Sequence, residues 1–117
     1  MTFYNSKGKP IAYLDNKDIY LFRGKPVAYI DRNAVYSFNG KHLGWFEDGW
    51  IRDLSGNCVF STNNSTGFGP VIPVASVEPV ASVQQVQPVP SVQQVAQVRA
   101  VNTSNWSHLS GEAFFYQ

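Results

Sequence analysis

The chain of 117 residues contains a single cysteine, Cys58, which excludes an intrachain disulfide framework and a zinc site built from several cysteines. Charge is also scarce and balanced, since 9 lysines and arginines stand against 8 aspartates and glutamates. This balance provides no basic surface, so we expect neither nucleic acid nor a membrane as a partner. No run of about 18 apolar residues is present, and the start Met1–Lys7 does not resemble a secretory signal. We therefore expect a cytoplasmic protein.

Motifs of catalysis and cofactor binding are missing as well. There is no glycine-rich phosphate loop and no pair of histidines at helical spacing, so we expect no enzyme, no cofactor and no metal site. What the chain does contain is divided unevenly. Residues 1–70 hold 14 of the 17 charged and 13 of the 17 aromatic residues, whereas 11 valines lie between Val71 and Val101.

A repeat of 16 residues runs through the first half, marked by Gly8, Gly24, Gly40 and Gly56. Sixteen residues are too few for a helical repeat, and the β-branched and aromatic composition favours strands. The residue pairs that end on these glycines, such as Asn39-Gly40, predict two-residue type I′ hairpin turns. Polar stretches such as Asp15–Asp18 are expected as loops between hairpins. The sequence thus predicts a mainly β fold of four hairpins, packed around a pseudo-fourfold axis.

The pattern Tyr-x-x-x-Gly-Lys-Pro-Ile/Val-Ala-Tyr-Leu/Ile-Asp, at Tyr4–Asp15 and again at Tyr20–Asp31, resembles the bacterial four-fold β-flower domain. The segment Trp106–Phe115 is similar to the C-terminal ending of that family. The resemblance implies four petal-like hairpins with the C-terminal segment packed back on them, and it implies no catalytic or binding residues. We divide the chain into a four-hairpin domain (1–66), a Val/Pro/Gln-rich tract or linker (67–103) and a C-terminal anchor (104–117). The anchor is expected to start a short helix with Ser110 as its N-cap.

Valine occupies every third position from Val71 to Val101. A period of three fits neither an α-helix nor a strand, and prolines at 79, 88 and 90 oppose a helix. Polyproline II has three residues per turn, so it would place every valine on one edge and extend the tract over about 93 Å. Such a tract must project, bend or pair with other chains. It is either a low-complexity linker or a stripe whose valines are buried against the hairpins or in a bundle of chains.

Two groups of side chains are candidates for a site. Pairing across two-residue turns would place Ser37 opposite His42 and Asp53 opposite Cys58, on the face expected to line the axis. A cysteine beside a histidine is a nucleophile arrangement, although polar residues near degenerate turns account for the same pattern. The second group is aromatic and would either fill the interior or bind sugars and peptides by stacking: Tyr4, Tyr20, Tyr36, Tyr13, Tyr29 and Trp45.

From these features we expect a non-enzymatic structural or interaction module. It would self-associate as a homo-oligomer, or bind a protein partner, through the valine tract. The alternative is a module that binds glycans or peptides on its aromatic hairpin faces. A hydrolase that uses His42 and Cys58 is a more distant alternative.

Overall fold

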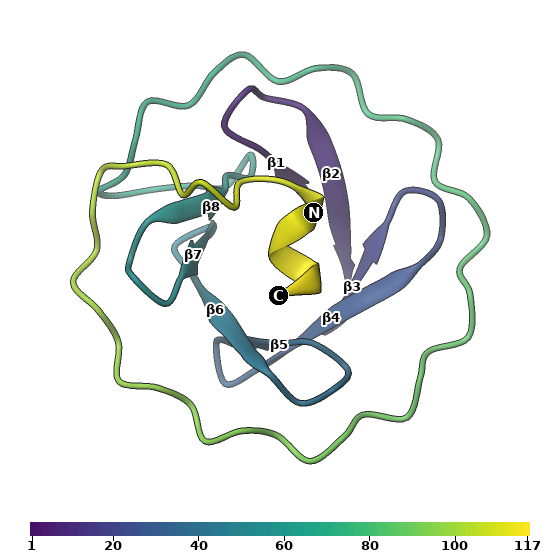
Figure 1. Ribbon diagram of the computed structural model, residues 1–117. Helices are drawn as coiled ribbons and strands as arrows, with labels where there is room; N and C mark the ends of the chain where they lie inside the picture. The colour runs from purple at the N-terminus through teal and green to yellow at the C-terminus, as the bar shows by residue number, and fades with distance from the viewer.

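The computed structural model describes all residues, 1–117, and forms a disc with extents of 36 × 36 × 22 Å. Eight antiparallel strands pair in sequence order. Their bounds are β1 (Thr2–Tyr4), β2 (Pro10–Asp15), β3 (Asp18–Leu21), β4 (Pro26–Asp31), β5 (Ala34–Tyr36), β6 (His42–Glu47), β7 (Trp50–Asp53) and β8 (Cys58–Phe60). Tyr4 and Ser61 exchange two backbone hydrogen bonds of 2.9 Å, which brings the last strand back to the first. The strands therefore form a nearly closed, barrel-like sheet around a central axis (Figure 1), as the fold class predicted.

The glycine loops are built differently from the predicted type I′ turns. In the second petal the N–H of Gly24 donates to the carbonyl of Leu21, whose own N–H donates to the carbonyl of Lys25. This is a three-residue loop in which the glycine alone has positive φ, and it adds a bulge to the strand pair. Turns with two central residues at positive φ occur instead between the petals, at Arg32–Asn33 and Asp48–Gly49. The polar stretches thus continue the sheet from one petal to the next.

The core lies on the axis and is completed by the C-terminus. The only helix, the 3₁₀-helix η1 (Glu112–Tyr116), occupies the centre of the strand ring in Figure 1 and is too short to cross a membrane. Its buried rings Phe114 and Phe115 lie 5.9 and 5.5 Å from the ring of Phe60. Ala12 and Ala28 are fully buried in the same cluster as these rings.

Ser110 does not cap this helix, contrary to the prediction. The helix begins after Gly111 and has no side-chain cap. The hydroxyl of Ser110 instead donates to the carbonyl of Val59 and accepts a hydrogen bond from the N–H of Ser6. The serine therefore fastens the C-terminal segment to the last strand and to the first petal loop.

The valine tract forms neither helix nor strand and encircles the petals as a belt (Figure 1). We use this name for residues 71–103. The predicted burial of the valines against the hairpins is wrong, because all eleven valines are 87–96% exposed in the single chain. The strict period of three is nevertheless reflected in the structure, since the exposed valines all fall in one phase of the repeat and the hydrogen bonds to the petals come from the residues between them. This is the side-chain arrangement of a helix with three residues per turn.

The belt contacts the four petals at intervals of nine residues. Ser76, Gln85, Gln94 and Thr103 donate backbone hydrogen bonds of 2.8–3.1 Å to the carbonyls of Gly8, Gly24, Gly40 and Gly56. At each of these glycines a Cβ would overlap the carbonyl of the valine two residues before the donor, so the close approach requires glycine as much as the positive φ does. Nine residues at a rise of 3.1 Å span about 28 Å, which is about one quarter of the circumference of a 36 Å circle. The nine-residue interval therefore matches one petal.

Candidate functional site

The polar pairs predicted at the axis do not form. His42 lies opposite Tyr36 rather than Ser37, and Cys58 lies opposite Arg52 rather than Asp53. The reason is the bulge at each glycine loop, which shifts the pairing by one residue relative to a two-residue turn.

His42 lies beneath the belt rather than at the axis. Its Nδ1 accepts a hydrogen bond from the N–H of Gln97, and its Nε2 lies 2.9 Å from the carbonyl of Gly44. This arrangement assigns the proton to Nε2 in a neutral imidazole. Burial agrees with it, since desolvation lowers the pKa of His42. The histidine therefore holds the belt to the third petal.

Cys58 is fully buried on β8 and lies under the C-terminal segment. Its N–H donates to the carbonyl of Asn105, and its carbonyl accepts from the N–H of Ser107. Burial raises the pKa of the thiol to about 11, outweighing the opposite effect of the Arg52 charge. A thiol with this pKa is protonated near neutral pH, so the site offers no thiolate nucleophile. No group of three or more histidine, cysteine or carboxylate side chains is placed to hold a metal ion.

Four of the six predicted aromatic residues form two stacked pairs at the inner side of the belt. Tyr13 stacks on Tyr20 and Tyr29 stacks on Tyr36, each with ring centroids 5.7 Å apart. Trp45 takes the corresponding place in the third petal, where its ring meets His42 edge to face at 4.8 Å. These rings form the floor on which the belt lies.

Glutamines of the belt hydrogen-bond to this layer of aromatic residues in two successive petals. The amide of Gln84 donates to the hydroxyl of Tyr13 and to the carboxylate of Asp15. Nine belt residues and one petal later, the amide of Gln93 donates to Tyr29 and Asp31 in the same way. The tyrosine hydroxyls and the carboxylates thus hydrogen-bond to the glutamines between the valines. Because the glutamines face the petals, the valines face outward.

A second series of contacts uses the tyrosines near the petal loops. The carboxylate of Glu78 accepts hydrogen bonds from the hydroxyls of Thr2 and Tyr4, and these bonds lower its pKa. Nine residues later, the amide of Gln87 donates to the hydroxyl of Tyr20 at 2.8 Å. Ala96 occupies the next position in the series and has no polar group for Tyr36.

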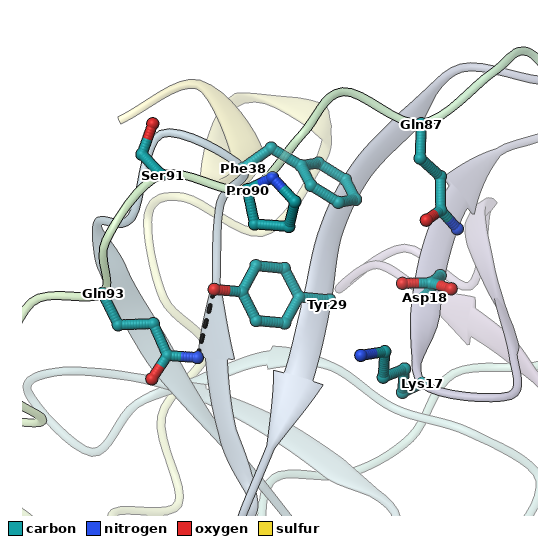
Figure 2. A pocket seen from close by; sticks show the side chains of 8 residues that line it. All are labelled: Lys17, Asp18, Tyr29, Phe38, Gln87, Pro90, Ser91 and Gln93. Carbon is teal, nitrogen blue, oxygen red and sulfur yellow. Dashed lines mark hydrogen bonds between the residues drawn. The ribbon is translucent and has the colours of Figure 1, made fainter.

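Two pockets open between the belt and the petals. Figure 2 shows the first, of about 260 Å³, where Tyr29 and Phe38 face Gln87 and Pro90 of the belt. The second, of about 410 Å³, lies one petal further along. It is bounded by Tyr36 and Trp45 on the petal side and by Gln93–Ala96 on the belt side.

Arg52 is a residue whose role the sequence did not reveal. It replaces the repeated tyrosine in the fourth petal and is 3% exposed. Its guanidinium donates to the carbonyls of Phe68, just before the belt, and of Thr103, at the end of the belt, as well as to Gly56. Arg52 therefore joins the two ends of the belt. The signal that could have revealed it is the replacement of tyrosine by arginine at a position in register with Tyr4, Tyr20 and Tyr36.

The sequence profile described as 4-fold beta flower protein matches residues 1–115. The chain belongs to this family. The matched span of the β-flower profile includes the belt and the C-terminal helix as well as the petals. No curated protein and no solved structure matches the chain.

Proposed function

We propose that this β-flower protein is a non-enzymatic interaction module of the cytoplasm that self-associates through the outward valines of its belt. The observation that carries the proposal is the exposure of all eleven valines, at 87–96%, in an unbroken series around the rim of the disc. Eleven exposed valines that all lie in one phase of the belt leave much apolar side-chain surface in water, which favours contact with another molecule.

The electrostatics of the rim support contact between identical copies. The belt carries only two charges, Glu78 and Arg99, and both are turned toward the petals, where they bond to Thr2 and Glu47. The whole chain has a formal charge of +1, so two copies repel each other little. Each valine that leaves water on contact contributes on the order of 1.5 kcal/mol.

The geometry of the rim predicts the character of this association. A convex rim can bring only a few valines of each copy into one contact, far less than the surface of a stable dimer interface. The belt presents the same edge in several directions, so one disc can contact more than one neighbour. We therefore expect weak self-association that increases with protein concentration. The belt is already held by the petals, so association has little chain entropy to overcome.

Sedimentation velocity over a range of concentrations tests the proposal. Replacing all eleven belt valines by threonine keeps the branched shape and removes the apolar surface in every direction, and it should shift the protein to monomer. The matched control replaces two exposed belt alanines on other edges, Ala75→Thr and Ala81→Thr, and should sediment like the wild type. A wild-type protein that is monomeric at every concentration, or a valine variant that still associates, would refute the proposal.

A further inference from the structure

Belt and petal residues change together where the belt crosses the third petal. One position of the nine-residue belt series corresponds to one position of the 16-residue petal series in each of the first three petals: Pro79, Pro88 and Gln97 in the belt, and Pro10, Pro26 and His42 in the petals. Proline has no N–H, so the belt needs no acceptor at this point of the first two petals. In the third petal the N–H of Gln97 donates to Nδ1 of His42 at 3.2 Å. The next members of the two series, Trp106 and Cys58, form a β-bridge, so the two series also meet in the fourth petal.

Three hydrogen bonds hold His42 in this position. Its backbone N–H, which a proline lacks, donates to the side-chain oxygen of Gln94 at 3.0 Å. Nε2 lies 2.9 Å from the carbonyl of Gly44 and donates to it, while Nδ1 accepts from Gln97. Both ring bonds require a neutral imidazole, because the imidazolium carries a hydrogen on each nitrogen. A proton on Nδ1 would face the N–H of Gln97, and this bond of the belt would be lost.

The ring of His42 is closed off from water. The residue is 1% exposed, and its ring lies 5.3 Å from the ring of Tyr36 and meets the ring of Trp45 edge to face at 4.8 Å. This burial lowers the pKa of His42, and the hydrogen bond to Gly44 opposes the effect only in part. Lifting the belt from the ring would return the pKa toward its ordinary value of 6.5.

The charged groups around this histidine give an imidazolium no free carboxylate partner. The belt contributes Arg99, whose guanidinium lies over the neighbouring indole and pairs with Glu47 of the same petal. The adjacent strand β7 contributes Arg52, which bonds to backbone carbonyls, and Asp53, whose carboxylate accepts N–H groups of its own loop. Lys41 precedes the histidine in the chain. A proton taken up by the ring is therefore stabilised only when the belt opens and water reaches it.

We propose that His42 is an acid-sensitive latch, whose protonation releases the belt segment Gln94–Arg99 from the third petal. A proton from the solvent binds Nδ1 and replaces the hydrogen bond from Gln97. The released segment uncovers the rings of Tyr36 and Trp45. The first two petals have prolines at the corresponding positions, so their contacts with the belt stay closed. The latch lies beneath the belt, away from the valine edge, so it does not depend on self-association.

The pH range of the release follows from the pKa of the histidine in the two states of the belt. The pKa is near 6.5 when the belt is open and lower when it is closed. The contribution of the latch is therefore fully present above pH 6.5 and is lost as pH falls from 6.5 toward the lower pKa. Over this range the ratio of open to closed belt should increase by up to about tenfold for each pH unit.

Nitrogen-15 NMR of the full chain in dilute solution, between pH 8 and pH 5, tests the latch. The imidazole nitrogen shifts should show the Nε2–H tautomer of His42 at pH 8. The hydrogen-exchange protection factor of the Gln97 amide should fall about tenfold between pH 7 and pH 5. The Gln85 amide, which bonds to the second petal, should keep its protection. A Gln97 protection factor that does not change over this range, or an equal loss at Gln85, would overturn the proposal.

Variants of the two histidines separate the proton from the side chain that carries it. His42→Asn places an amide oxygen near the position of Nδ1, and this oxygen accepts from Gln97 at every pH, so the protection of Gln97 should not change between pH 7 and pH 5. His108→Asn is the matched control, because His108 is exposed, and it should keep the pH dependence of the wild type. If His42→Asn does not fold, His42→Gln supplies the oxygen on a longer side chain. A folded variant of His42 in which the protection of Gln97 falls as in the wild type would contradict the proposal.

Discussion

The nine-residue interval of the belt predicts that shortening the belt and lengthening it have unequal effects. Deleting Val86–Pro88 removes one valine triplet and keeps every remaining valine on the outer edge. The segment between the contacts at Gly24 and Gly40 is then reduced from nine residues to six. Its reach falls from about 28 Å to about 19 Å, so one of the two contacts must open.

The cost of opening one contact can be worked out from its hydrogen bonds. At the third petal the belt donates two backbone bonds of 2.8 Å, from Ser91 to Phe38 and from Gln94 to Gly40. Gln93 adds its hydrogen bonds to Tyr29 and Asp31, and the deletion itself removes Gln87 and its bond to Tyr20. At about 1 kcal/mol net for each of these four interactions, the deletion should destabilise the protein by about 4 kcal/mol. For a domain of this size, that corresponds to a decrease in Tm of about 15 °C.

Duplicating the same triplet is the matched control. Three additional residues can bulge away from the petals while both contacts remain closed. The added loop entropy amounts to less than about 0.5 kcal/mol, so Tm should change by no more than about 2 °C. Thermal unfolding of the wild type and the two variants, followed by circular dichroism, measures the difference. Equal Tm values for the deletion and the duplication would show that the belt does not need its register, and would refute this reasoning.

Three further predictions concern single residues. Replacing Arg52 by Lys keeps the charge but loses the forked guanidinium that bonds the carbonyls of both Phe68 and Thr103. The variant should have a free energy of unfolding about 3 kcal/mol lower in urea titrations, and a loss below about 1 kcal/mol would contradict this role. The thiol of Cys58, with its pKa raised to about 11, should react with iodoacetamide at pH 8 only after denaturation, and rapid alkylation of the native protein would show that the thiol is exposed or ionised. Glu78 has a lowered pKa in the folded protein, so its contribution is present above its ordinary pKa and is lost as pH falls through the folded value. The stability advantage of the wild type over Glu78→Gln should therefore disappear in acid, and an advantage that persists at pH 2 would disprove this origin.

The strand content and the order of the petals could be predicted because they depend on local signals. Glycine at intervals of 16 residues identifies the loop positions, and the strands of residues 1–60 follow from the alternating aromatic and β-branched residues between them. The loop type was not predictable in the same way. Arg23-Gly24 fits both a two-residue turn and the last two residues of a three-residue loop. The choice between the two moved His42 and Cys58 out of their expected pairs.

The sequence predicts only some of the residues that line the pocket between the third petal and the belt. The sequence predicts Tyr36 and Trp45 as aromatic candidates, and the structure brings both to one pocket. Their belt partners were not identified, because the nine-residue series of Gln84 and Gln93 has meaning only beside the 16-residue series of Tyr13 and Tyr29. The two series have different intervals in the sequence but meet in space. Nine residues of the extended belt and 16 residues of the petal repeat cover the same quarter turn around the axis.

The sequence by itself determined the hairpin repeat, the family and the one-sided valine edge, since each depends on spacing along the chain. Only the tertiary structure decided which way that edge points. A rule based on hydrophobicity turns valine inward, but the petals present backbone carbonyls and tyrosine hydroxyls to the belt. These groups require hydrogen-bond partners, and only the residues between the valines can supply them. The polar residues therefore face the petals, and the valines face the solvent.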